Sequence, residues 1–100
     1  MKNNRAGLVQ QTVIEGVTVG VKIKQSALKH GKTAEDVLSV LNTAIYDETI
    51  AVDPNKTLIV GYDKSANLTE IIVHVVSDES VIVFHSMACR KVYLKKAIKG

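Results

Sequence analysis

The chain contains very little of several residue types that would point to particular functions. Its 100 residues include one cysteine, one proline and no tryptophan, and aromatic residues make up 4% of the total. The single cysteine, Cys89, excludes an intramolecular disulfide and a zinc site built from cysteines. The scarcity of aromatic side chains leaves little for a stacking platform of the kind that many single-strand-binding proteins use. The core must therefore be built from valine, isoleucine and leucine.

Long apolar runs and targeting signals are missing as well. No run approaches the roughly 20 apolar residues that cross a bilayer. The basic start Met1–Arg5 is not followed by the apolar segment of a secretory signal peptide. The length suits one domain. We therefore expect a cytoplasmic protein in a reducing environment, without a membrane partner.

Acidic residues are absent from the end of the chain. Residues 91–100 contain four lysines and no carboxylate, and Arg90 stands just before them, although the formal net charge of the whole chain is only +3. This asymmetry predicts a basic face and favours a polyanionic partner, which we take to be RNA. The alternative is that the lysines only complement the dipole at the end of a helix.

The N-terminal part of the chain is expected to be an extension that contains a strand. Residues 12–24 alternate with period two, which predicts an edge strand or a hairpin that bends at Gly16 or Gly20. We place the extension at residues 1–20 and the single folded domain at 21–100. An exposed edge on this first strand could pair two chains into a homodimer.

Two short helices are expected next. Residues 25–30 can form a helical turn that ends at Gly31. Thr33 then caps the clearest helix of the chain, and Asp36 three residues later supplies a near capping box. The apolar stripe of this helix consists of Val37, Leu38, Leu41, Ala44 and Ile45.

Four apolar segments follow, separated by short polar turns. They cover residues 47–52, 57–62, 68–76 and 80–84. Connections this short join antiparallel neighbours, so the segments predict an antiparallel β-meander, with 68–76 near its centre because it is the most apolar. The residues from His85 onward have helical spacing and predict a C-terminal helix. The expected fold class is therefore α+β.

His85 and Arg90 are the strongest chemical candidates. Metal-independent cleavage of RNA needs proton transfer from a 2′-hydroxyl and to the leaving 5′-oxygen, and a cation beside the phosphorane. Histidine transfers protons near neutral pH, and the guanidinium group matches phosphate geometry. The alternative is that His85 caps a helix and Arg90 is an ordinary surface residue.

A second basic cluster surrounds Gly31. Lys29, His30 and Lys32 lie on this expected turn, where a glycine lets a phosphate approach the backbone. The alternative is a solvated turn whose only structural requirement is Gly31.

The remaining candidates are weaker. Tyr93 follows Arg90 by three residues, so both can project from one side of the terminal helix, or Tyr93 can simply pack. His74 stands among valines and isoleucines, a pattern typical of a histidine that simply lies on the face of a sheet. No two histidines are spaced as paired metal ligands, and we expect neither a metal nor another cofactor.

Several segments together resemble the BrnT-like toxins. Residues 24–37 resemble the opening of that family, in which a short helix ending in His-Gly leads into a helix with an acidic pair. Residues 57–61, 68–75 and 83–90 resemble its meander and final helix, in a variant with the pattern His-x-Met-x-x-Arg. Typical members carry Ser-Ala-Arg where this chain has His-Ser-Met at 85–87.

The resemblance implies a RelE-like fold and a metal-independent endoribonuclease, the toxin of a type II toxin–antitoxin pair that a cognate antitoxin neutralises. Its substrate would be RNA, free or on the ribosome. On this hypothesis His85 is the general acid or base, Arg90 stabilises the transition state and His30 supports the phosphate side. The substrate-binding residues would be Lys29, Lys32, Lys91, Tyr93 and Lys95. The alternative is a RelE-like module that binds protein or nucleic acid without catalysis.

Overall fold

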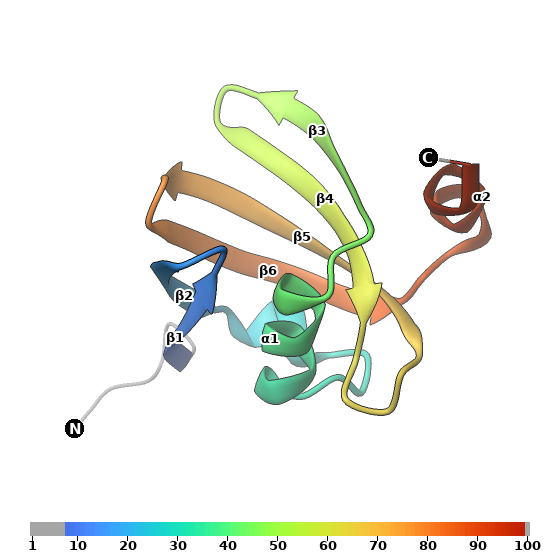
Figure 1. The fold of residues 1–100 in the computed structure, drawn as a ribbon, viewed down its shortest axis with the longest axis horizontal. Helices are drawn as coiled ribbons and strands as arrows, with labels where there is room; N and C mark the ends of the chain where they lie inside the picture. Colours follow the sequence, from blue (N-terminus) through green and yellow to red (C-terminus); the bar gives the residue numbers. More distant parts are fainter. Residues whose placement is uncertain (1–7, 100) are drawn as a thin grey trace.

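A six-stranded sheet organises residues 8–99, the part of the chain that the computed structural model describes. The strand order is β1-β2-β6-β5-β4-β3 (Figure 1). The strands are β1 (Leu8–Ile14), β2 (Val17–Ile23), β3 (Tyr46–Val52), β4 (Asn55–Tyr62), β5 (Leu68–Ser77) and β6 (Ser80–Ala88). The helices are the 3₁₀ turn η1 (Gln25–Leu28), α1 (Ala34–Asn42) and α2 (Lys91–Lys99). The first residues of the expected N-terminal extension, 1–7, lie outside the described part.

The expected α+β class and the antiparallel meander are confirmed. Strands β3, β4, β5 and β6 pair consecutively and antiparallel. The sheet as a whole is nevertheless mixed, because β2 lies parallel to β6. Parallel neighbours need a long connection, and the chain provides one by passing through η1, α1 and the first three strands of the meander between them.

The expected N-terminal hairpin is present and bends at Gly16. Glu15 and Gly16 both have positive φ angles, 51° and 83°. Two positive φ angles in a two-residue loop match the twist of the flanking strands. Strand β2 continues from this turn through Gly20 to Ile23, so residue 20, where we expected the extension to end, lies inside a strand of the main sheet.

Helix α1 begins at the expected capping box. The Thr33 hydroxyl accepts from the Asp36 N–H at 3.1 Å, and the Asp36 carboxylate accepts from the Thr33 N–H at 2.9 Å. The helix ends at Asn42, so Ala44 and Ile45, which we expected in its apolar stripe, lie beyond it. Their place in the stripe is taken by Val40, which is fully buried.

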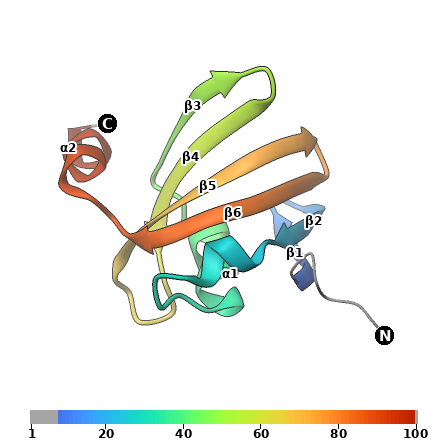
Figure 2. The same ribbon diagram turned by 180° about the vertical axis from the view of Figure 1, so that it is seen from behind.

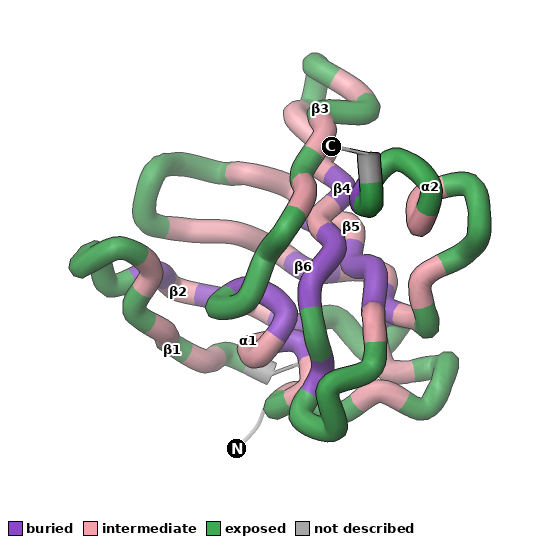
Figure 3. Tube along the Cα trace, turned by 45° about the vertical axis from the view of Figure 1, so that its right-hand side comes forward, coloured by how far each residue is buried: buried purple, intermediate pink, exposed green. Residues whose placement is uncertain are grey.

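The main core lies between α1 and one face of the sheet. It joins buried residues of α1 and η1 to buried residues of β2, β5 and β6, and Figure 3 shows the buried positions along the central strands. The largest buried members on the sheet side are Val21, Ile23, Ile71, Val73 and Val83. Two β4 side chains, Leu58 and Val60, are also fully buried but alternate with Ile59, so they point to the opposite face.

The C-terminal helix begins later than predicted. Strand β6 continues to Ala88 because β5 extends far enough to pair with it, with Glu70 opposite Met87 and Thr69 opposite Ala88. His85 therefore lies in a strand and does not cap a helix. Helix α2 begins only at Lys91 and stands apart from α1 beyond the end of β6 (Figure 2). Neither α1 nor α2 is long and apolar enough to cross a bilayer, and no other described helix is.

Helix α1 packs on β4 at Gly61, and this close approach leads to a prediction about stability. A Cβ added at Gly61 would lie 2.6 Å from the Val40 carbonyl oxygen. We expect Gly61→Ala to lower the free energy of unfolding by about 1–3 kcal/mol, the usual cost of overpacking. Gly20→Ala is the matched control, because its Cβ would meet only Glu79 O at 3.7 Å. Urea unfolding of both variants is the measurement, and equal midpoints would contradict the prediction.

Candidate functional site

A buried carboxylate on β5 lies at the centre of the main polar cluster. Glu70 has no exposed surface. Its Oε2 atom lies 2.9 Å from His85 Nε2 and 2.6 Å from Arg90 Nη2. Its Oε1 atom accepts from the backbone N–H of Arg90 at 2.9 Å and from Nε of Arg90 at 3.1 Å. The histidine and the arginine that the sequence singled out therefore converge on one carboxylate.

The strand register brings these groups together. His85 is paired with Ile72, two residues along β5 from Glu70, so both side chains lie on one face of the β5–β6 pair. A β-bulge leaves Phe84 without a partner in this ladder, since the next pair is Val73 with Val83. Bulges of this kind redirect neighbouring side chains. Arg90 stands in the short segment between β6 and α2.

The cluster keeps Glu70 ionised. Burial acts to raise the pKa of Glu70, but hydrogen bonds from the Arg90 side chain and backbone, and then from His85, outweigh it and lower that pKa below its ordinary value. The same pair raises the pKa of Arg90. An ionised carboxylate can only accept hydrogen bonds, so we assign the proton of His85 to Nε2. The remaining ring nitrogen, Nδ1, is then the one free to accept a proton.

A second histidine lies beside His85. The ring centroids of His30 and His85 are 6.0 Å apart with an angle of 64° between the ring planes. The side chain of His85 is 21% exposed and that of Arg90 is 47% exposed, so the cluster reaches the surface while Glu70 does not. The structure thus brings all three predicted catalytic residues into one place, although they come from three different segments.

Glu70 is the member of this cluster that sequence reasoning missed. The available signal was an acidic residue inside the most apolar strand of the chain, in the run Leu68-Thr69-Glu70-Ile71-Ile72. A charged residue in such a run is rarely fully buried unless it is paired. The identity of its partners could not be read from the sequence, because they lie 15 and 20 residues further on.

Lys32 is paired elsewhere. Its ammonium group lies 2.7 Å from the Asp63 carboxylate, and both side chains are largely buried. This hydrogen bond is the main reason that the pKa of Asp63 is lowered to about 2. The charge of Lys32 is therefore already balanced by Asp63, which weakens its attraction for a phosphate.

The other predicted substrate-binding residues remain on the surface. Lys29, Lys91 and Lys95 are exposed. Tyr93 lies under the Arg90 guanidinium, whose central carbon is 5.2 Å from the ring centroid. The two side chains lie together as expected, although Arg90 directly precedes α2 and is not part of that helix.

No group of three or more histidine, cysteine or acidic side chains within residues 8–99 is arranged to hold a metal ion. His74 lies away from the Glu70 cluster, where it helps to line a surface pocket. Neither a protein-family model, nor a curated protein, nor a solved structure gives a significant match to the chain.

Proposed function

We propose that the protein is a metal-independent endoribonuclease and the toxin of a type II toxin–antitoxin pair. The observation that supports this best is the placement of two imidazoles beside a guanidinium, with one imidazole oriented by a buried, ionised carboxylate. Such an arrangement supplies proton transfer and a fixed positive charge, which are the two requirements for cleaving a phosphodiester without a metal.

The proposed reaction is an attack of the 2′-hydroxyl on the adjacent phosphorus. His85 Nδ1 accepts the 2′-hydroxyl proton while the bond from the 2′-oxygen to phosphorus forms. The bond from phosphorus to the 5′-oxygen breaks, and a protonated His30 donates the proton that this oxygen needs. The products are a 2′,3′-cyclic phosphate and a free 5′-hydroxyl.

Glu70 and Arg90 have supporting parts in this scheme. Glu70 fixes the tautomer and orientation of His85, as a carboxylate commonly does for a catalytic histidine. With Nε2 hydrogen-bonded to Glu70, the other ring nitrogen of His85 is left for the proposed role of base. The half-exposed guanidinium keeps its remaining N–H groups for the oxygens of the phosphorane.

The partners follow from the same proposal. The substrate is RNA, the inhibitor is a cognate antitoxin, and the site of action is the cytoplasm. A homodimer formed through β1, an edge strand of the sheet, stays a prediction that light scattering can test.

The direct test is cleavage by the purified protein of naked RNA in the presence of EDTA and, in a separate reaction without EDTA, of RNA on translating ribosomes. We expect new 5′-hydroxyl ends and 2′,3′-cyclic phosphates in at least one of the two reactions. Expression of the protein in bacterial cells should stop growth, and co-expression of the antitoxin should restore it. Absence of cleavage under both conditions, together with normal growth, would refute the proposal.

One observation favours the alternative, a binding module without catalysis. Glu70 accepts hydrogen bonds from both Nε and Nη2 of Arg90. These two groups form an edge of the guanidinium with which arginine often binds a phosphate through two hydrogen bonds. If this pair serves only the fold, the protein would bind its partner and leave RNA intact. Stable RNA binding without cleavage in the assay above would support this function.

A further inference from the structure

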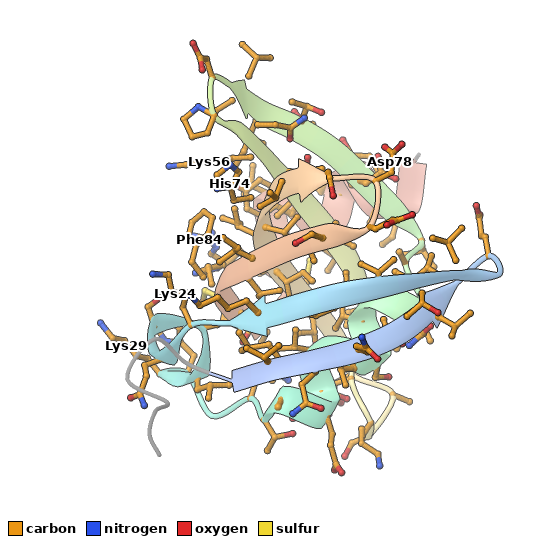
Figure 4. The ribbon with its side chains drawn as sticks, turned by 90° about the vertical axis from the view of Figure 1, so that its left-hand side faces the viewer. Lys24, Lys29, Lys56, His74, Asp78 and Phe84 are labelled. Atoms are coloured by element: carbon orange, nitrogen blue, oxygen red, sulfur yellow. The ribbon has the colours of Figure 1, made fainter. Side chains whose placement is uncertain are left out.

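A second polar surface lies on the face of the sheet opposite α1, the same face as Glu70 but further along the strands. It is a shallow pocket of about 290 Å³. Its lining residues are Lys24, Lys56, His74, Ile82 and Phe84. Figure 4 shows the labelled basic and aromatic members along one side of the molecule, followed by Lys29, while Asp78 lies on the other side.

The strand register brings the lining residues of this pocket together from β4, β5 and β6, beside Lys24, which directly follows β2. Lys56 of β4 pairs with His74 of β5, His74 pairs with Ile82 of β6, and Ile82 pairs with Lys22 of β2. Directly paired residues place their side chains on the same face, so the four form a row across the sheet. Phe84, the unpaired residue of the β-bulge, lies beside this row.

The charges of this surface are not balanced by the protein. The lining residues of the pocket include no carboxylate. Within residues 8–99, none of the lysines 22, 24 and 56 takes part in an ion pair. Lys56 instead lies over the Phe84 ring, with its Nζ atom 5.3 Å from the centroid. A partly exposed aromatic ring among unpaired lysines offers a flat apolar surface and positive charge at the same place.

We infer that this pocket binds one nucleotide of single-stranded RNA, with its base on the Phe84 ring and its flanking phosphates near Lys24 and Lys56. Phe84 directly precedes His85 in β6, so a base held here would lie next to the phosphate that the proposed reaction cleaves. The inference rests on the proposed function for its choice of RNA, and it identifies where the strand enters the site. It also gives a function to the only phenylalanine of the chain.

The chemistry of the pocket favours a nucleotide over an acidic peptide. Base stacking on an aromatic side chain is tolerant of sequence and contributes about 1–3 kcal/mol per base. A carboxylate has no comparable flat surface, and it would use only the lysines. In a duplex the bases are stacked on one another, so only an unpaired strand can offer a base to Phe84.

The experiment measures binding without relying on cleavage. A fluorescent 2′-O-methyl RNA 12-mer has no 2′-hydroxyl to attack, so it reports affinity alone, by fluorescence anisotropy at several salt concentrations. We expect Phe84→Leu, which keeps apolar volume, to weaken binding about tenfold. The double variant Lys24→Gln/Lys56→Gln should weaken binding and reduce the slope of log affinity against log salt by about 1.4, or 0.7 for each lysine.

Lys64→Gln is the matched control, because its side chain is exposed and pairs only weakly with Glu35, at 3.7 Å. Its affinity and salt slope should equal those of the wild type. Thermal unfolding of each variant identifies any that has lost its fold, and Phe84→Tyr, which keeps the ring, should bind like the wild type.

The outcomes separate this inference from the proposed function. Weakened binding by the pocket variants, with RNA left uncut both free and on ribosomes and with normal growth of the cells, would support the pocket and refute the nuclease. Normal binding by both pocket variants would overturn the inference, whatever the cleavage result. Equal competition by a polyglutamate peptide of matched charge would also overturn it, because charge alone would then explain the binding.

Discussion

Arg90→Ala is expected to lower the free energy of unfolding by about 3 kcal/mol at pH 7, because it leaves the buried carboxylate of Glu70 without its cation. Breaking a buried ion pair by removing one partner commonly costs 3–5 kcal/mol. The lower end of that range applies because Arg90 itself is 47% exposed, whereas Glu70 is completely buried. The backbone N–H of residue 90 and Nε2 of His85 still donate to the carboxylate in this variant, but neither replaces the lost guanidinium charge.

The pH dependence of this loss has a definite sign. In the wild type the lowered pKa of Glu70 contributes stability above the ordinary value of 4.5, and this contribution is lost as the pH falls through the folded pKa. In the variant, burial is opposed only by the hydrogen bonds from the backbone N–H of residue 90 and from His85, so the folded pKa of Glu70 lies above its wild-type value. Ionisation of Glu70 then stabilises the variant less than the wild type, so the difference between the two proteins shrinks from pH 7 towards pH 4.

Urea unfolding at several pH values between 4 and 8 measures this effect. The double variant Glu70→Gln/Arg90→Ala is the control, because it has no charge at the buried position 70. We expect it to be more stable than Arg90→Ala at pH 7. A double variant that is less stable than Arg90→Ala would show that the cost comes from lost packing and not from an unpaired carboxylate.

His85→Ala is expected to slow RNA cleavage by about 10²-fold or more, in the usual range for a group that transfers a proton. Its effect on stability should be small in comparison, because Glu70 keeps its hydrogen bonds from Arg90. A large loss of rate with a nearly unchanged unfolding midpoint separates catalysis from folding.

The measurement is the initial rate of appearance of 2′,3′-cyclic phosphate ends, compared with Glu35→Gln as a surface control. The carboxylate of Glu35 is 75% exposed on α1, and that variant should cleave at the wild-type rate. An unchanged rate in His85→Ala would remove this residue from the mechanism and leave the binding module as the better reading of the site.

The sequence predicts well wherever the interactions are local. The capping box of Thr33 and Asp36 spans four residues, and the hairpin bend at Gly16 needs only two residues that accept positive φ. Short turns likewise impose the antiparallel pairing of β3 to β6. Each of these features depends on the conformational preferences of a few neighbouring residues, which are visible in the chain itself.

The prediction from sequence was wrong where pairing with a distant strand overrides a local helical pattern. Residues 85–88 have a helical pattern, but β5 offers a ladder of backbone hydrogen bonds that extends β6 to Ala88. The parallel pairing of β2 with β6 has the same origin, because it joins segments about 60 residues apart. Local preference is weak compared with the pairing of a whole strand.

The residues themselves determined an α+β chain with a basic C-terminus, a capped central helix and three polar candidates at positions 30, 85 and 90. Only the tertiary structure decided that His85 and Arg90 meet at Glu70 with His30 beside His85. It also decided that Lys32 is bound to Asp63 and that Phe84 lies among unpaired lysines. The physical reason is that partners of a buried charge and neighbours across a sheet are chosen by register. Register is established only when all the strands assemble together.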